Sequence, residues 1–303
     1  MGQAVGVVSN RVKSAFTPAG SAFTIWGVIY TLAVLCVIFL AWKWKDSFKN
    51  FGRRTYITLS VNFLLNGVWI FLWTGAGAGS AILWTSVVFM VGILATLIMV
   101  YRWAGAASAR ASSSWAESLC VRTFLSVYLG WISVAIIANV AGAATPVDGA
   151  TPGWGLGAAT WASVMLSVAG ILALAQATLY FDVGYPAVIA WASWWVSVQQ
   201  SEPNWPGDDN TVGVARTVFG VAIFAVAIAL GGGLYRMLSL KQPWQPAWPS
   251  IAASGCGPVT MYAPAMPEDD EAGEALSPKE NPATAPHTGE AEDWPKRPAA
   301  ARA

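Results

Sequence analysis

Seven long apolar segments constrain this chain more than any other feature of its sequence. A helix needs about 20 mainly apolar residues to cross a bilayer, because about 30 Å of hydrocarbon is traversed at about 1.5 Å per residue. Only 11% of the residues are charged, whereas soluble domains carry about 25%. The sequence therefore predicts an all-α, polytopic integral membrane protein. The seven expected transmembrane helices are Ser21–Trp42, Thr55–Trp73, Ser80–Tyr101, Thr123–Ala144, Gly157–Tyr180, Val183–Val198 and Thr211–Tyr235.

The distribution of basic residues between these segments predicts how the chain is oriented in the membrane. Five lysines and arginines lie in the first loop, between Lys43 and Arg54, and the third loop contains Arg102, Arg110 and Arg122. The second, fourth and sixth loops contain neither lysine nor arginine. Because cytoplasmic loops are enriched in these residues, we expect the N-terminus outside and the C-terminus in the cytoplasm. The pattern does not indicate which membrane holds the protein.

Composition divides the chain into three parts. A short polar segment, residues 1–20, precedes the transmembrane domain, which we expect over residues 21–240. Residues 241–303 hold eleven of the seventeen prolines and nine of the sixteen acidic residues. Such a segment buries too little apolar surface to offset the entropy lost on ordering its backbone. We therefore predict a disordered, acidic, proline-rich cytoplasmic tail.

The chemistry of the chain argues against several functions. A net charge of +1 with no basic stripe disfavours nucleic acid as a partner. The chain has three cysteines and one histidine, and its spans hold hardly any ionisable residue, so no acid, base, nucleophile or metal-ligand group is visible in them. The last span contains no lysine, which excludes a retinal Schiff base. We expect neither enzymatic activity nor a required cofactor or metal.

Aromatic and amide side chains recur at helical spacing on three of the expected spans. Residues three or four apart lie on one face of a helix. An amide that faced lipid would leave its hydrogen-bonding groups unpaired, so these faces should point into the bundle. The stripes are Phe23, Trp26 and Tyr30 on the first span, Asn62, Asn66, Trp69 and Trp73 on the second, and Tyr128, Trp131, Ala135 and Asn139 on the fourth.

The stripes support two interpretations. Three converging faces rich in rings, with a few amides, predict a pocket for a flat apolar ligand that carries polar groups at its edge. Alternatively, Asn66 and Asn139 join helices by hydrogen bonds and the rings are ordinary core residues.

The order of these motifs along the chain resembles the translocator protein family, also called tryptophan-rich sensory proteins or TspO. The resemblance covers roughly Phe16–Thr145, under half of the chain. Compact members of that family have five helices, and the first four helices here look like the second to fifth of theirs. The motifs are Phe23-Thr24-Ile25-Trp26 followed by Tyr30, Asn66-Gly67-Val68-Trp69, and Tyr128-Leu129-Gly130-Trp131 with Ala135 and Asn139.

The resemblance implies a seven-helix, extended form of this family that binds porphyrins and synthetic aromatic molecules within the bundle. It suggests a porphyrin or haem as the ligand, rather than as a cofactor. From the stripes and the resemblance together, the ligand-binding candidates are Phe23, Trp26, Tyr30, Asn66, Trp69, Tyr128, Trp131, Ala135 and Asn139.

The function that we expect is binding of a small hydrophobic, tetrapyrrole-like ligand by a membrane sensor or transporter. One alternative is a facilitative transporter of another small molecule, in which the last three helices form the moving part. Another is a membrane scaffold that acts through its acidic tail. Candidate partners are the lipid bilayer, the hydrophobic ligand, a second copy of the chain in a homodimer, and a cytoplasmic protein bound by the tail.

Overall fold

The computed structural model describes residues 6, 9, 13–75, 80–110, 118–144 and 156–239. These residues form seven α-helices, one 3-10 turn and one π-helical turn, and the described part contains no β-strand. The predicted tail, residues 241–303, lies outside the described residues. In chain order the elements are η1 (Gly20–Thr24), α2 (Ile25–Trp42), α3 (Trp44–Gly75), α4 (Ser80–Arg110), η2 (Ser118–Arg122), α6 (Thr123–Ala144), α7 (Ala158–Tyr180), α8 (Gly184–Gln200) and α9 (Asp209–Ser239).

Six of the seven described helices are long and apolar enough to cross a membrane, so the chain is an integral membrane protein. Most predicted boundaries are close to those observed, and α6 begins and ends at the expected Thr123 and Ala144. Two differ: α3 begins at Trp44, before the predicted Thr55, and α4 continues to Arg110, beyond the predicted Tyr101. The seventh helix, α8, is too short to count among these six. Its 17 residues extend over about 25 Å, which is less than the hydrocarbon thickness of about 30 Å. Ten of these residues are buried, so other helices rather than lipid surround most of α8.

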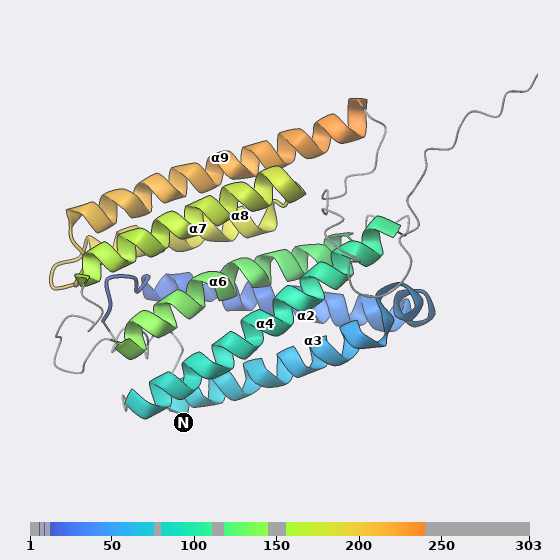
Figure 1. Cartoon of the computed structure of the whole chain (residues 1–303), viewed down its shortest axis with the longest axis horizontal. Coiled ribbons are helices and arrows are strands. Elements are labelled where there is room, and N and C mark those ends of the chain that lie inside the picture. Colours follow the sequence, from blue (N-terminus) through green and yellow to red (C-terminus); the bar gives the residue numbers. More distant parts are fainter. Residues whose placement is uncertain are drawn as a thin grey trace, which may run out of the picture. The chain divides into compact units, whose positions relative to one another are not determined.

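Consecutive helices run in opposite directions, so the bundle has two ends (Figure 1). We call them the Gly20 end, where η1 and α2 begin, and the Trp42 end, where α2 finishes. The pair α3 and α4 packs together, α4 also packs against α6, and α2 packs along α6. The remaining helices, α7, α8 and α9, form a second group, and α8 connects this group to α6.

The central position of α6 follows from its small and apolar residues. In the most apolar stretch of α6, about 67% of the residues are buried, against 28–33% in the corresponding stretches of the other five span-length helices. Gly130 lets α8 approach α6 closely: a Cβ added there would lie 3.1 Å from the Cβ of Val188 and 3.2 Å from the carbonyl oxygen of Tyr185. The three tryptophan-bearing stripes therefore meet around a helix that contacts both groups.

A break near the start of α3 separates a short leading helix from the long one that carries the second stripe. Gly52 has φ 73° and ψ 159°, a backbone conformation that residues with a side chain rarely adopt. The long helix then runs from Arg53 to the Gly20 end and includes the predicted span Thr55–Trp73.

At the Trp42 end, Asp182 holds the two groups of helices together. The hydroxyl of Tyr101 on α4 donates to Oδ2 of Asp182 at 2.5 Å, and the hydroxyl of Ser126 on α6 donates to Oδ1. The backbone N–H groups of Gly184 and Tyr185 donate to the same Oδ1 at 2.9 and 3.3 Å. One carboxylate in the α7–α8 turn thus fixes the beginning of α8 against both α4 and α6.

Candidate ligand-binding site

Trp26, which is buried in the first turn of α2, lies at the centre of a group of aromatic rings. Its indole stacks on Tyr30 and on Trp69, with ring centroids 5.4 and 5.5 Å apart. It meets Tyr128 and Trp131 edge to face, both at 6.3 Å. All four distances fall in the range favoured by aromatic pairs. Rings from α2, α3 and α6 therefore converge on one indole.

Helical spacing explains why these rings converge. Phe23 precedes Trp26 by three residues, and its ring meets that of Trp131 edge to face, with ring centroids 5.8 Å apart. On α3, Trp73 follows Trp69 by four residues, and the two indoles stack at 6.0 Å. The cluster therefore extends from Trp26 toward the Gly20 end of the bundle.

The structure places six of the nine predicted residues around one cavity at this cluster. Its free space is about 30 Å³, which is enough for about two water molecules. The rings that would face a flat ligand stack on one another instead. The predicted residues that line it are Phe23, Trp26, Trp69, Trp131, Ala135 and Asn139, and the remaining lining residues are Ser9, Thr17, Pro18, Trp73, Met90, Val134, Ala138 and Gly142.

The other three predicted residues lie beside the cavity, one turn closer to the Trp42 end. The hydroxyl of Tyr30 donates to Oδ1 of Asn66 at 3.3 Å, which joins α2 to α3. Tyr30 is 41% exposed on the outside of the bundle, whereas Asn66 is buried. Tyr128 is also buried, and its ring stacks on Phe124 at 5.6 Å. These three residues therefore lie next to Trp26 but do not line the cavity.

The amides of the stripes also join helices, as the second interpretation predicts. The hydroxyl of Ser86 on α4 donates to Oδ1 of Asn139 at 2.8 Å. On α3, Nδ2 of Asn62 donates to the carbonyl oxygen of Ile93 and to Thr96, at 2.9 and 2.8 Å. Asn62 serves the α3–α4 contact alone, while Asn139 both bonds α4 and lines the cavity. Asn139 therefore joins α6 to α4 and also lies on the wall of the cavity.

Three indole N–H groups at the cavity are buried without an acceptor. They belong to Trp26, Trp69 and Trp131, and no acceptor for them lies within the described part of the chain. An indole N–H can only donate, and leaving a buried donor unpaired costs about 1–3 kcal/mol. The site therefore combines ring faces for stacking with donors that an acceptor atom on a ligand would satisfy.

Sequence reasoning missed two parts of the cavity wall. Met90 lies on α4, a span with no aromatic or amide stripe, where its burial follows from packing against α3 and α6. Ser86, four residues before Met90, is the sequence feature that could have indicated this face, because a buried hydroxyl needs a hydrogen-bond partner. Thr17 and Pro18 come from the segment before η1, and nothing in their local sequence indicates contact with the cavity.

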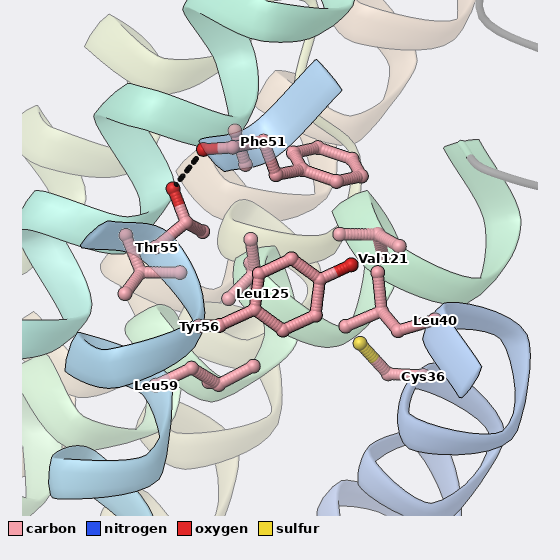
Figure 2. Close-up of a pocket in the computed structure, with 10 residues that line it drawn as sticks. Cys36, Leu40, Phe51, Thr55, Tyr56, Leu59, Val121 and Leu125 are labelled. Atoms are coloured by element: carbon pink, nitrogen blue, oxygen red, sulfur yellow. Dashed lines mark hydrogen bonds between the residues drawn. The ribbon is translucent and has the colours of Figure 1, made fainter. Parts of the chain in front are cut away.

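A second pocket lies at the Trp42 end, between α2, α3, α4 and α6 (Figure 2). Its lining is apolar, and the sulfur of Cys36 points toward Tyr56 and Leu40. The hydroxyl of Thr55 donates to the carbonyl oxygen of Phe51 at 2.7 Å, within α3. The enclosed space is about 10 Å³, room for about one water molecule. This pocket contains no residue of the three stripes, so the aromatic cluster is the better candidate site.

Fold and site together define a class: a helical integral membrane protein whose tryptophan-rich helices enclose an aromatic cavity. A family model described as TSPO-like protein matches residues 1–233, and the chain belongs to this family. The match is wider than the motif resemblance over residues 16–145, because it includes α7, α8 and most of α9. No curated protein and no solved structure matches the chain.

Proposed function

We propose that this TSPO-like membrane protein binds a small, flat, hydrophobic and tetrapyrrole-like ligand in the aromatic cavity, as a sensor or transporter. The observation that carries the proposal is the set of three buried indole N–H groups without acceptors around one cavity. Ordinary apolar packing would not place unpaired donors together, because each one destabilises the folded state. A porphyrin or haem supplies both an extended ring face and acceptor atoms at its edge.

In the proposed mechanism, the ligand replaces contacts that the rings now make with each other. Trp26 stacks on Trp69 in the closed cavity, so a flat ligand inserted between them would keep both ring faces covered. The N–H groups then donate to acceptors on the ligand. Asn139, at the cavity wall, and Asn66, beneath Trp26, supply amides for its polar edge.

Ligand binding requires the cavity to widen. The free space of about 30 Å³ holds water-sized molecules only, so the rings must separate before a tetrapyrrole fits. Widening exposes stacked ring surface that the ligand covers again. A sensor would read this change in the bundle, and a transporter would couple it to passage across the membrane.

The test is equilibrium binding of protoporphyrin to the detergent-purified full chain, followed by its visible absorbance. The variants are Trp26→Ala, Asn66→Ala and Trp131→Ala, and Trp194→Ala is the control because Trp194 packs on Phe219 of α9, away from the cavity. We expect saturable one-to-one binding to the wild type and the control, weakened in the three cavity variants. Equal affinity in all five folded proteins would contradict the proposal.

Sensing and transport are separated by a second measurement. Wild-type protein in proteoliposomes is given protoporphyrin on one side, and the porphyrin that reaches the interior is quantified over time. Flux that depends on Trp26 supports the transporter role, whereas binding without flux supports the sensor role.

A further inference from the structure

The segment that leads into η1 is anchored firmly although residues 13–19 form no helix. The backbone N–H of Thr17 donates to the carbonyl oxygen of Ser14 at 3.0 Å, which closes a turn, and Ser14 N–H donates to Oγ1 of Thr17 at 3.1 Å. Phe16, at the tip of this turn, is only 1% exposed. Its side chain lines a small pocket together with residues of α6, α7, α8 and α9, which include Val134, Leu166, Ile189, Val196 and Val218.

Gln200, the last residue of α8, holds this turn in place. Its Nε2 donates to the carbonyl oxygens of Ser14 and Thr17, at 3.2 and 2.9 Å. Its Oε1 accepts from the backbone N–H of Gly207 in the α8–α9 loop at 2.9 Å. The side chain is only 4% exposed, so these bonds form away from bulk water. One amide therefore ties the N-terminal segment to the end of α8 and to the loop that follows.

Further contacts attach the same segment to α8. The backbone N–H of Ala19 donates to the carbonyl oxygen of Trp195 at 3.1 Å. The indole N–H of Trp191 donates to the carbonyl oxygen of Ala22 at 3.0 Å. These tryptophans do not line the aromatic cavity, and their contacts lie along the path from the segment into η1.

The anchored segment forms part of the cavity wall. Thr17 and Pro18 line the aromatic cavity together with Phe23 and Trp73, at the Gly20 end. Thr17 is thus both a hydrogen-bond acceptor for Gln200 and a wall residue. Displacing residues 13–19 would remove this wall and connect the cavity to the Gly20 end of the bundle.

We propose that Gln200 is a positioning residue that holds residues 13–19 across the aromatic cavity, so that α8 and the α8–α9 loop control access to it from the Gly20 end. The nature of the molecule admitted rests on the proposed function, whereas the control of access rests on these contacts alone. Control of access gives α8, which is shorter than a membrane span, a specific role at the site.

The amide of Gln200 suits this role because it offers two donors and one acceptor on a short side chain. Leucine has similar size but neither donor nor acceptor, so Gln200→Leu removes all three bonds while filling the same space. The carbonyl oxygens of Ser14 and Thr17 then lose this donor within a buried environment, and moving the segment toward water restores their hydrogen bonding. We expect the open form to become about ten-fold more populated, which corresponds to about 1.4 kcal/mol.

The test measures access to the cavity without using the ligand. Cys36, Cys120 and Cys256 are replaced by alanine in the full chain, and a single reporter cysteine is introduced as Ala138→Cys in the cavity wall. The purified protein in nanodiscs reacts with a small water-soluble methanethiosulfonate reagent, and the modified fraction is followed by mass spectrometry. The rate is compared between the reporter alone, with Gln200→Leu, and with Gln199→Leu as the matched control on the same helix.

An approximately ten-fold faster reaction with Gln200→Leu, and an unchanged rate with Gln199→Leu, supports the role of Gln200. Equal rates in all three proteins overturn it. If Gln200→Leu does not fold, Gln200→Asn is the second variant. Its side chain is one methylene shorter, so its amide no longer reaches the carbonyl oxygens of Ser14 and Thr17. Association and dissociation of protoporphyrin are measured in parallel, and both should be faster in Gln200→Leu. If no protein binds protoporphyrin, the result counts against the proposed function. The thiol-reaction rates still decide the role of Gln200 in that case.

Discussion

The indole of Trp26 stacks on that of Trp69 with ring centroids 5.5 Å apart and ring planes inclined by 30°. The two residues lie on different helices and belong to two of the three stripes. A pair of this kind contributes about 0.5–1.5 kcal/mol beyond the burial of its area. The contact closes the cavity from within, and a flat ligand would have to separate the two rings.

Replacing an indole by a phenyl ring separates the contribution of the N–H donor to ligand affinity from that of the ring surface. Trp131→Phe keeps an aromatic ring in the wall but removes one unpaired N–H. If that N–H donates to the ligand, we expect affinity for protoporphyrin to fall about five-fold, since a net hydrogen bond contributes about 1 kcal/mol. Trp131→Ala should weaken binding further because the ring contact is lost as well. Dissociation constants from absorbance titrations provide the comparison, and equal affinity of Trp131→Phe and wild type would assign the site to stacking alone.

Asp182 is expected to stabilise the junction between the two groups of helices. Asp182→Ala leaves the hydroxyls of Tyr101 and Ser126 without this acceptor, and the turn before α8 loses two backbone hydrogen bonds. Hydrogen bonds to a charged group contribute about 1.5–3 kcal/mol each, although partial exposure of the turn reduces this. We expect a clear fall in Tm in detergent, whereas Glu202→Ala, an exposed control, should change it little. Equal Tm values would show that the carboxylate does not hold the junction.

Gly130 and Gly67 offer a matched pair for testing the α6–α8 contact. Alanine is favoured over glycine by about 1 kcal/mol within a helix. At Gly67 a Cβ meets nothing within 4 Å, so Gly67→Ala should be neutral or stabilising. At Gly130 the Cβ would lie 3.1 Å from Val188, so Gly130→Ala should lower the Tm by pushing α8 away. A stabilising effect at both positions would mean that the helices do not approach each other this closely.

The start of α9 should be sensitive to acid. Asp208 lies outside the spans, and its pKa is lowered because the backbone N–H and the hydroxyl of Thr211 donate to its carboxylate. A lowered pKa means that the ionised form stabilises the fold above the pKa of the unfolded chain, and that this contribution is lost as the pH falls through the folded-state pKa. Tm measured from about pH 6 down to about pH 3 should therefore fall more in wild type than in Asp208→Asn. The asparagine keeps a capping oxygen without a charge to titrate. Parallel curves for the two proteins would remove Asp208 from the acid response.

Much of the fold was predictable because bilayer-crossing helices are long, apolar and locally determined. The limits of α6 were predicted to the residue, and the stripes identified the rings that meet at Trp26. Pro186 lies in the first turn of α8, where its missing N–H costs little. Periodicity identified these rings because it reports which residues share a face of a helix.

Contacts between residues far apart in sequence were not predictable in the same way. No local pattern indicates that Gln200 bonds the backbone of Ser14, or that Asp182 accepts from Tyr101. The sequence also did not show that α8, the shortest of the seven described α-helices, would have ten of its 17 residues buried among other helices. These features depend on how helices pack, and packing is decided by side-chain shape across the whole bundle.

Occupancy of the aromatic cavity by the ligand is the central claim, and a protection measurement tests it most directly. A single cysteine introduced as Ala135→Cys in the cavity wall is allowed to react with a small thiol reagent, with and without saturating protoporphyrin. Ala227→Cys, on an exposed part of α9, serves as the control. We predict that protoporphyrin slows the reaction at residue 135 by at least about ten-fold, as expected when over 90% of the sites are filled. The control rate should not change. Equal slowing at both positions, or none at residue 135, would contradict the claim that this cavity is the ligand site.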